Sequence, residues 1–178
     1  DIYKLMNNLQ IILKENLIKE YNKQEFFKKL QPHLIGGKYL YHYTLTDNLE
    51  SILEDGLIPK HSPNSFYKNG VKGIFLTNSD SLYNANLPQS LMDIMDDYYD
   101  NKSAYDQKPL IRLTIDVGKL EPTKLMWDDD YIQNKYGWNK AKTKEDKIIE
   151  SLNIWRAIAY LDKIDKSLII SKDFKYHA

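Results

Sequence analysis

The fold is decided by residues 39–59, which read YLYHYTLTDNLESILEDGLIP. The aromatic and apolar run at residues 39–43 predicts a buried strand, because such side chains favour strands. Asp47 is a suitable N-cap for a helix through residues 49–53, where leucine and isoleucine recur at helical spacing. Gly56 then supplies the C-terminal stop. The stretch therefore predicts a strand, a helix and a tight turn in succession.

Downstream of this stretch, short apolar runs alternate with polar segments. Residues 59–70 contain prolines, asparagine and serine without periodicity and predict a loop over the end of the first strand. Further strands are expected at 73–77, 110–117, 154–161 and 167–171, helices at 79–83 and 144–153, an exposed acidic stretch around 93–100, and an irregular segment at 127–138. Several short strands with interspersed helices indicate an α+β fold.

Upstream, apolar residues recur at helical spacing over residues 2–21 and predict an amphipathic helix. A second short helix is expected at 24–30, before Pro32, and Gly36-Gly37 then break the chain. We therefore divide the sequence into an N-terminal helical extension, 1–37, and a main domain, 38–178. The apolar stripe of the extension is expected to pack on its own domain; docking on a protein partner is the alternative.

The composition bounds the class of protein. The 178 residues suit one domain, and 25 basic and 25 acidic side chains balance, so a nucleic-acid partner would need a local patch. The absence of cysteine excludes thiolate catalysis and cysteine-ligated zinc and fits a reducing compartment. No apolar run is long enough to span a membrane. We expect a cytoplasmic protein that does not bind membranes.

Two groups of residues resemble a known family. Residues 41–44 (YHYT), 48–53 (NLESIL) and 56–59 (GLIP) resemble the first motif of ADP-ribosyltransferases of the diphtheria-toxin and poly(ADP-ribose) polymerase branch, in which a histidine ends a strand and a helix closes on a Gly-Leu turn. Residues 73–83 (GIFLTNSDSLY) are similar to the second motif, a Gly-Ile-Tyr-Phe strand followed by a serine-rich helix start and a tyrosine. The order and spacing of the two motifs also fit.

A third resemblance lies near the C-terminal end. Residues 155–160 (WRAIAY) and 163–169 (KIDKSLI) are similar to the closing strand and the Ile-Pro-x-x-x-Ile edge of DNA-modifying toxins of the DarT type. Together the three resemblances cover most of residues 39–170. They imply an ADP-ribosyltransferase-like split β-sandwich with short helices, preceded by the N-terminal amphipathic helix.

The resemblance implies a site for NAD, which such proteins hold bent, with the nicotinamide amide on the backbone at a strand end. His42 would hydrogen-bond the adjacent ribose, Thr44 would add a hydroxyl contact, and Gly73 would let the backbone approach closely. An aromatic ring at Phe75 or Tyr83 would stack on the charged nicotinamide. The implied NAD-binding residues are His42, Tyr43, Thr44, Gly73, Ile74, Phe75, Thr77, Ser79 and Tyr83.

The catalytic acid of the family has no direct counterpart. Related enzymes place a glutamate at the start of the closing strand, where it stabilises the positive charge that develops on the ribose. The matching position here is Arg156 or Ala157. Glu150 is the nearest acid and would reach in from the preceding helix, whereas the guanidinium of Arg156 suits a phosphate better. The candidate catalytic residues are therefore His42, Glu150 and Arg156.

Other polar residues have simpler interpretations. Ser79 and Ser81 serve equally well as helix caps. The run at residues 128–130, three aspartates, lacks the spaced oxygens and glycine of a calcium loop and is interpreted as a solvated turn. The histidines at 33, 61 and 177 have no zinc-ligand spacing, so we expect no metal.

Three functions follow as hypotheses. The first is an ADP-ribosyltransferase, a toxin or defence effector of bacterial or phage origin, that moves ADP-ribose from NAD to a macromolecular acceptor, with nucleic acid, and DNA in particular, favoured over protein. The acceptor would lie under the loop at residues 59–70. The second is a catalytically silent ADP-ribosyltransferase-like binding or inhibitory module. The third is an NAD-dependent RNA 2'-phosphotransferase, which the presence of only two arginines disfavours.

Overall fold

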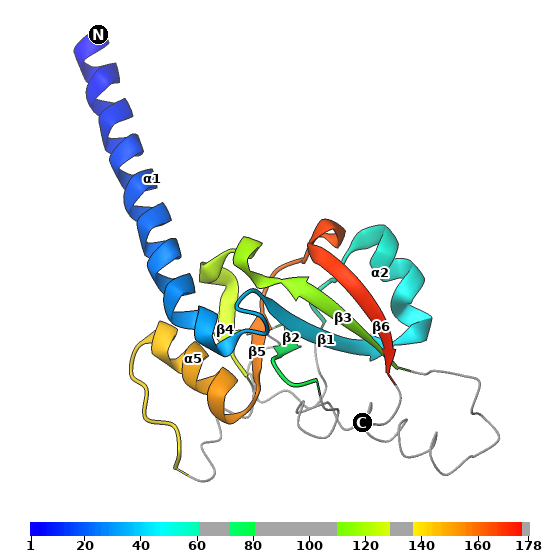
Figure 1. Ribbon diagram of the computed structural model, residues 1–178. Coiled ribbons are helices and arrows are strands. Elements are labelled where there is room, and N and C mark those ends of the chain that lie inside the picture. Colours follow the sequence, from blue (N-terminus) through cyan, green and yellow to red (C-terminus); the bar gives the residue numbers. More distant parts are fainter. Residues whose placement is uncertain (61–71, 81–109, 129–136, 176–178) are drawn as a thin grey trace, which may run out of the picture.

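The computed structural model describes residues 1–60, 72–80, 110–128 and 137–175 (Figure 1). They combine helices and a sheet, which confirms the expected α+β class. The helices are α1 (Ile2–Leu30), α2 (Leu49–Asp55) and α5 (Lys144–Ile154). The strands are β1 (Tyr39–Leu45), β2 (Ile74–Thr77), β3 (Leu110–Asp116), β4 (Leu125–Trp127), β5 (Ala157–Tyr160) and β6 (Ile169–Lys175). The predicted loop and acidic stretch, and most of the helix at 79–83, lie outside the described residues.

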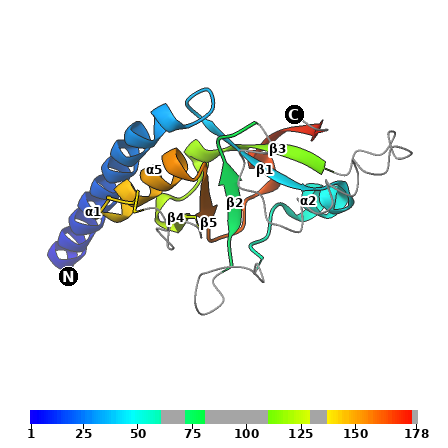
Figure 2. The same ribbon diagram turned by 90° about the horizontal axis from the view of Figure 1, so that it is seen from below.

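The strands form one six-stranded sheet in the order β4-β5-β2-β1-β3-β6, with antiparallel neighbours throughout. Thr77 of β2 lies opposite Tyr41 of β1 on one side and opposite Ala157 of β5 on the other. The three segments that resemble family motifs therefore contribute three adjacent strands. α5 and the last turns of α1 lie at the β4–β5 end of the sheet, and α2 lies toward the other end (Figures 1 and 2).

The two faces of the sheet differ because successive side chains of a strand point in opposite directions. One face carries the core, formed by residues such as Leu40, Leu76, Leu113 and Ile158, each at most 1% exposed. The other face is mixed, with polar and aromatic side chains beside the buried Leu110 and Ala159. There Arg112 lies 4.0 Å from the ring centre of Tyr41 and pairs with Asp173 at 3.2 Å.

The N-terminal extension is a single helix, not the two that the sequence predicted. Nothing at residues 21–24 interrupts it, since that segment contains neither proline nor glycine, and the chain turns only at the short 3-10 helix Gln31–His33, which holds Pro32. Only Phe26 and Leu30 of this helix are buried. Residues 2–21 are exposed, so the expectation that the stripe packs on its own domain is wrong. The first turns extend away from the body, and contact with it begins near Glu15 (Figure 1).

Several other helices and strands begin or end at residues that differ from the predicted ones. Asp47 belongs to a 3-10 turn, Thr46–Asn48, and the residue that precedes α2 is Asn48. β4 was not predicted, although it includes the start of the segment interpreted as irregular. β5 begins only at Ala157, because α5 continues to Ile154. No helix in the described part of the chain is both long and apolar enough to cross a bilayer.

Candidate functional site

His42 connects the two strands that carry the first and second motifs. It lies in β1, and its ring Nδ1 is 2.8 Å from the backbone oxygen of Phe75 in β2. A carbonyl oxygen only accepts hydrogen bonds, so Nδ1 must carry the proton of this bond. When the ring is neutral, Nε2 is then left as an acceptor. Such an atom can receive a hydrogen bond from a hydroxyl group.

The surroundings of His42 favour that neutral form. Burial lowers the pKa of His42 below its usual 6.5, and this effect outweighs the hydrogen bond to Phe75, which raises the pKa. The positive charge of Lys60 lowers it further. The histidine is therefore a neutral ring with a defined tautomer near pH 7, a state suited to binding a sugar hydroxyl and poorly suited to pairing with an anion.

Lys60 is a residue that sequence analysis missed. Its backbone exchanges two hydrogen bonds with Gly73, at 3.2 and 3.4 Å, at the start of β2, and its side chain is exposed. An exposed cation near a neutral histidine can attract an anionic group of a ligand that the histidine also contacts. In the sequence, Lys60 is distinguished only by its position near the start of the predicted loop at residues 59–70. That position is too weak a signal to select one lysine.

Several of the residues implied to bind NAD instead support one another. The hydroxyl of Tyr43 donates to the backbone oxygen of Ser79 at 3.2 Å, and burial raises the pKa of Tyr43 to about 12. The backbone N–H of Ser79 donates to the hydroxyl of Thr77 at 3.0 Å. By strand alternation Tyr43 points to the face opposite His42. These three residues thus fix the end of β2 against β1.

The remaining implied residues have mixed positions. The hydroxyl of Thr44, which is buried, accepts a hydrogen bond from Asn48 at 3.0 Å and so anchors the start of α2. Ile74 is buried in the core. A Cβ on Gly73 would lie 3.4 Å from the side chain of Ala159, so this glycine fits closely against β5, not against an open surface. Tyr83 lies outside the described residues.

The two candidate catalytic residues near β5 do not join His42. The carboxylate of Glu150 accepts hydrogen bonds from the backbone N–H groups of Lys140 and Ala141, the latter at 3.0 Å, and so holds that segment against α5. Arg156 is exposed and has a backbone φ of 60°. The next residue, Ala157, is 3% exposed and opposite Thr77. The two positions that sequence analysis compared with the family glutamate thus carry an exposed guanidinium and a buried methyl group.

The interpretation of residues 128–130 as a solvated turn is wrong for Asp128. The residue is 4% exposed, and its backbone N–H donates to the hydroxyl of Ser151 at 2.8 Å. Ser151 in turn donates to the backbone oxygen of Ala157 at 2.7 Å. A single buried serine of α5 therefore connects the end of β4 to the start of β5. The other two aspartates of the run lie outside the described residues.

The Gly-Leu turn of the first motif contacts the third motif directly. Leu57 and Ile164 exchange two backbone hydrogen bonds of 2.9 Å. Gly56 has a φ of 81°, and a Cβ at that position would lie 2.4 Å from the oxygen of Ile164. Only glycine fits this approach, so the turn and the edge after β5 form one closed contact, here called the Gly56 clasp.

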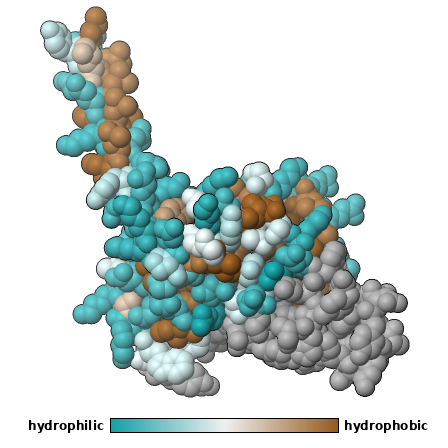
Figure 3. Space-filling view, viewed as in Figure 1, coloured by the Kyte–Doolittle hydropathy of each residue, from teal (hydrophilic) through white to brown (hydrophobic). Residues whose placement is uncertain are grey.

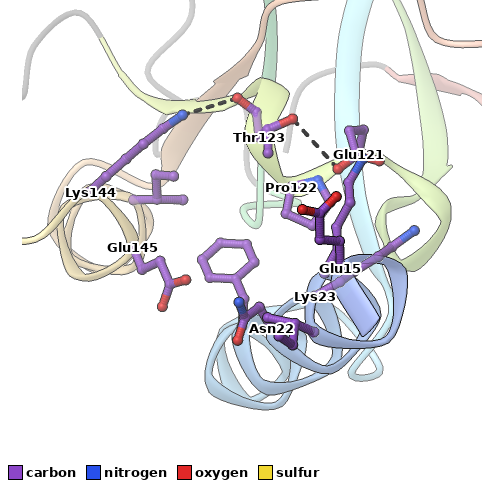
Figure 4. Close-up of a pocket in the computed structure, with 12 residues that line it drawn as sticks. Glu15, Asn22, Lys23, Glu121, Pro122, Thr123, Lys144 and Glu145 are labelled. Atoms are coloured by element: carbon purple, nitrogen blue, oxygen red, sulfur yellow. Dashed lines mark hydrogen bonds between the residues drawn. The ribbon is translucent and has the colours of Figure 1, made fainter. Parts of the chain in front are cut away.

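A pocket of about 530 Å³ lies elsewhere, between α1, α5 and the 3-10 turn Pro122–Lys124 (Figure 4). Charged side chains, among them Glu15, Lys23 and Glu145, stand around it. None of its lining residues is a predicted site residue. It is therefore separate from the surroundings of His42.

Within the described residues there is no group of three side chains able to hold a metal ion. No protein-family model and no curated protein matches the chain.

Proposed function

We propose that this chain is an ADP-ribosyltransferase-like domain that binds NAD or a related nucleotide beside His42 and does not transfer ADP-ribose. One observation carries the proposal: the strands that resemble the three family motifs are adjacent, with His42 retained on β1 and Ala157 at the start of β5. Under this proposal the sheet belongs to an ADP-ribosyltransferase-like fold that has kept binding groups and lost the catalytic acid.

The binding half of the proposal rests on the state of His42. A neutral ring whose Nδ1 is engaged by Phe75 offers Nε2 to a ribose hydroxyl. The charge of Lys60 suits the pyrophosphate of a dinucleotide. The charge of Lys60 contributes to the lowered pKa of His42, so the two groups are near enough for one dinucleotide to contact both.

The proposed lack of transfer follows from the charges of the residues near the start of β5. Cleavage of the nicotinamide bond leaves positive charge on the ribose, and a nearby carboxylate must stabilise it. At the start of β5 the described residues offer a buried alanine and an exposed arginine, and Glu150 is held by Lys140 and Ala141. A guanidinium would repel the developing charge. Binding without transfer is the outcome that this arrangement favours.

The test is titration of purified protein with NAD by calorimetry, followed by measurement of free nicotinamide after long incubation. We expect binding without nicotinamide release. His42→Ala should weaken binding by about tenfold, since one hydrogen bond contributes roughly 1 kcal/mol or slightly more. His33→Ala is the matched control, because His33 bonds Asn153 and is not a predicted site residue. Absence of NAD binding by the parent protein would refute the proposal.

An active transferase, with nucleic acid favoured over protein as the acceptor, is the second candidate. The left-handed backbone of Arg156 favours it, because a non-glycine residue at positive φ stores strain of order 1–3 kcal/mol and such strain concentrates at functional sites. Here Arg156 would bind a phosphate of NAD or of the acceptor. Incubation with NAD and mixed DNA, RNA and protein should then give ADP-ribose adducts by mass spectrometry, and Arg156→Ala should abolish them.

A further inference from the structure

The free part of α1 carries a continuous apolar stripe. Seven residues recur at intervals of three and four, and each is between 51% and 74% exposed: Ile2, Leu5, Met6, Leu9, Ile12, Leu13 and Leu17. We call this set the α1 stripe. Figure 3 shows apolar surface along one side of the projecting helix. Phe26 and Leu30, the two buried residues of α1, lie beyond it at the other end of the helix.

Such a stripe requires a cover. A helix in water is only marginally stable by itself, and most of its stability in proteins comes from packing an apolar face. The exposed stripe is also far more apolar than the surface of an ordinary helix, which has one face turned to solvent. None of the described residues covers the α1 stripe, so we interpret it as a contact surface.

We propose that the α1 stripe pairs antiparallel with the α1 stripe of a second copy of this chain, about a two-fold axis at Leu9. In that arrangement Leu9 faces itself, Leu5 faces Leu13, and Met6 faces Ile12, so apolar residues meet at the centre of the contact. At its two ends Ile2 faces Asn16 and Leu17 faces Asp1, so the apolar pairing is confined to the five central residues. A two-fold interface must be self-complementary in this way. The five central residues satisfy the condition, because they are symmetric in apolar character about Leu9.

The charges of the free helix agree with a second copy as the occupant. Lys4, Lys14 and Glu15 are the charged residues between Ile2 and Leu17. At about 100° of rotation per residue, all three project well away from the direction of Leu9, so pairing buries none of these three charges in the contact. A membrane-binding helix would have a polar face rich in lysine and arginine. Up to Leu17 this helix has two lysines, one glutamate and no arginine, a charge too small for membrane binding, which favours a protein partner.

The area and the shape are also sufficient. Removal of roughly 100 Å² for each of the five central side chains gives about 500 Å² per copy, or about 1,000 Å² in total, the lower bound of a specific interface. The stripe extends about 24 Å along the helix axis. An antiparallel pair places the two bodies at opposite ends of this length, where they do not collide, and sets the two helix dipoles in opposite directions.

Sedimentation analysis of the full chain tests the association. We expect a dimer at micromolar concentration. Leu9→Lys should raise the dissociation constant by at least about 100-fold, because two like charges would then meet at the axis. Asn7→Lys adds the same charge on the opposite side of the helix and should leave the dimer intact. A monomeric parent protein, or equal effects of the two variants, would overturn the proposal.

Cross-linking tests the orientation. The chain has no cysteine, so a single introduced thiol reports on one position only. Leu9→Cys should form a disulfide-linked dimer on oxidation, and Leu5→Cys alone should not, whereas a mixture of the Leu5→Cys and Leu13→Cys variants should link to each other. Efficient linking of Leu5→Cys to itself would indicate a parallel pair and contradict the proposal. NAD binding should not change in the Leu9→Lys variant, so this test is independent of the proposed function.

Discussion

Burial of His42 makes the stability of the protein sensitive to acid. In the folded protein the pKa of His42 is below 6.5, whereas the unfolded chain keeps the ordinary value. As the pH falls below about 6.5, the unfolded state binds more protons than the folded state, and the free energy of unfolding decreases by up to about 1.4 kcal/mol per pH unit until the folded-state pKa is reached. Above pH 6.5 this contribution is constant.

We therefore expect urea denaturation to show a larger loss of stability between about pH 8 and about pH 5.5 for the parent protein than for His42→Asn. The asparagine amide can still donate to Phe75 but does not titrate in this range. His33→Asn leaves His42 in place and should behave like the parent. An equal loss in the parent and in His42→Asn would show that His42 titrates normally in the folded state.

Gly56 is the second residue with a specific consequence. We expect Gly56→Ala to lower the free energy of unfolding by roughly 2–4 kcal/mol, because the methyl group would occupy a strained φ and lie against the oxygen of Ile164. Gly118→Ala is the matched control, since its Cβ would have an ordinary contact at 3.5 Å and no positive φ. Thermal or urea denaturation measures both. Similar stability of the two variants would mean that the Gly56 clasp opens without cost.

Among single residues, His42 and Gly56 could be identified from the sequence because both lie in the motif at residues 41–59. The sequence could not place their partners. The oxygen of Phe75 and the oxygen of Ile164 are backbone atoms, and no pattern of side chains reports on them. The same reason explains Asp128 and Lys60, whose burial and position depend on chain segments that are distant in sequence.

Among the elements, the join between α5, β4 and β5 depends on Ser151. We expect Ser151→Ala to cost about 2 kcal/mol of unfolding free energy, because the N–H of Asp128 and the oxygen of Ala157 would both lose their buried partner. Ser51→Ala is the control, as that hydroxyl bonds Asn48 at the surface. Hydrogen exchange at Asp128 should also become faster. Unchanged exchange would indicate that another group takes the place of the serine.

The strength of the periodic signal decided which elements were predicted. β1, β3 and α5 were found close to their true bounds, since each has a clear pattern over seven or more residues. β4 has three residues and no pattern of its own; it exists because β5 offers hydrogen-bond partners. α1 was divided in two because its apolar residues thin out after Tyr21, although the backbone has no reason to break there.

For the whole molecule, the α+β class followed from the order of the elements, but the sheet order did not. Residue patterns predict strands, and they do not say which strand lies beside which. The position of α1 could not be predicted either, because an amphipathic helix has the same sequence pattern whether it packs on its own domain or on another chain. If α1 pairs with a second copy, two nucleotide sites would lie far apart on one dimer.

The Gly56 clasp has a consequence for how the chain folds. It joins Leu57 to Ile164, and β3 pairs with β6, so the contacts that close the sheet connect residues separated by large parts of the sequence. Closing long loops is entropically costly before the contacts form, and proteins dominated by such contacts fold in milliseconds to seconds. During synthesis, β1 can pair with β3 only after residue 116 has emerged, and β3 can pair with β6 only after residue 175 has emerged. The sheet can be completed only after residue 175 has left the ribosome: until β5 and then β6 emerge, the edges of β2 and β3 in turn lack their neighbours.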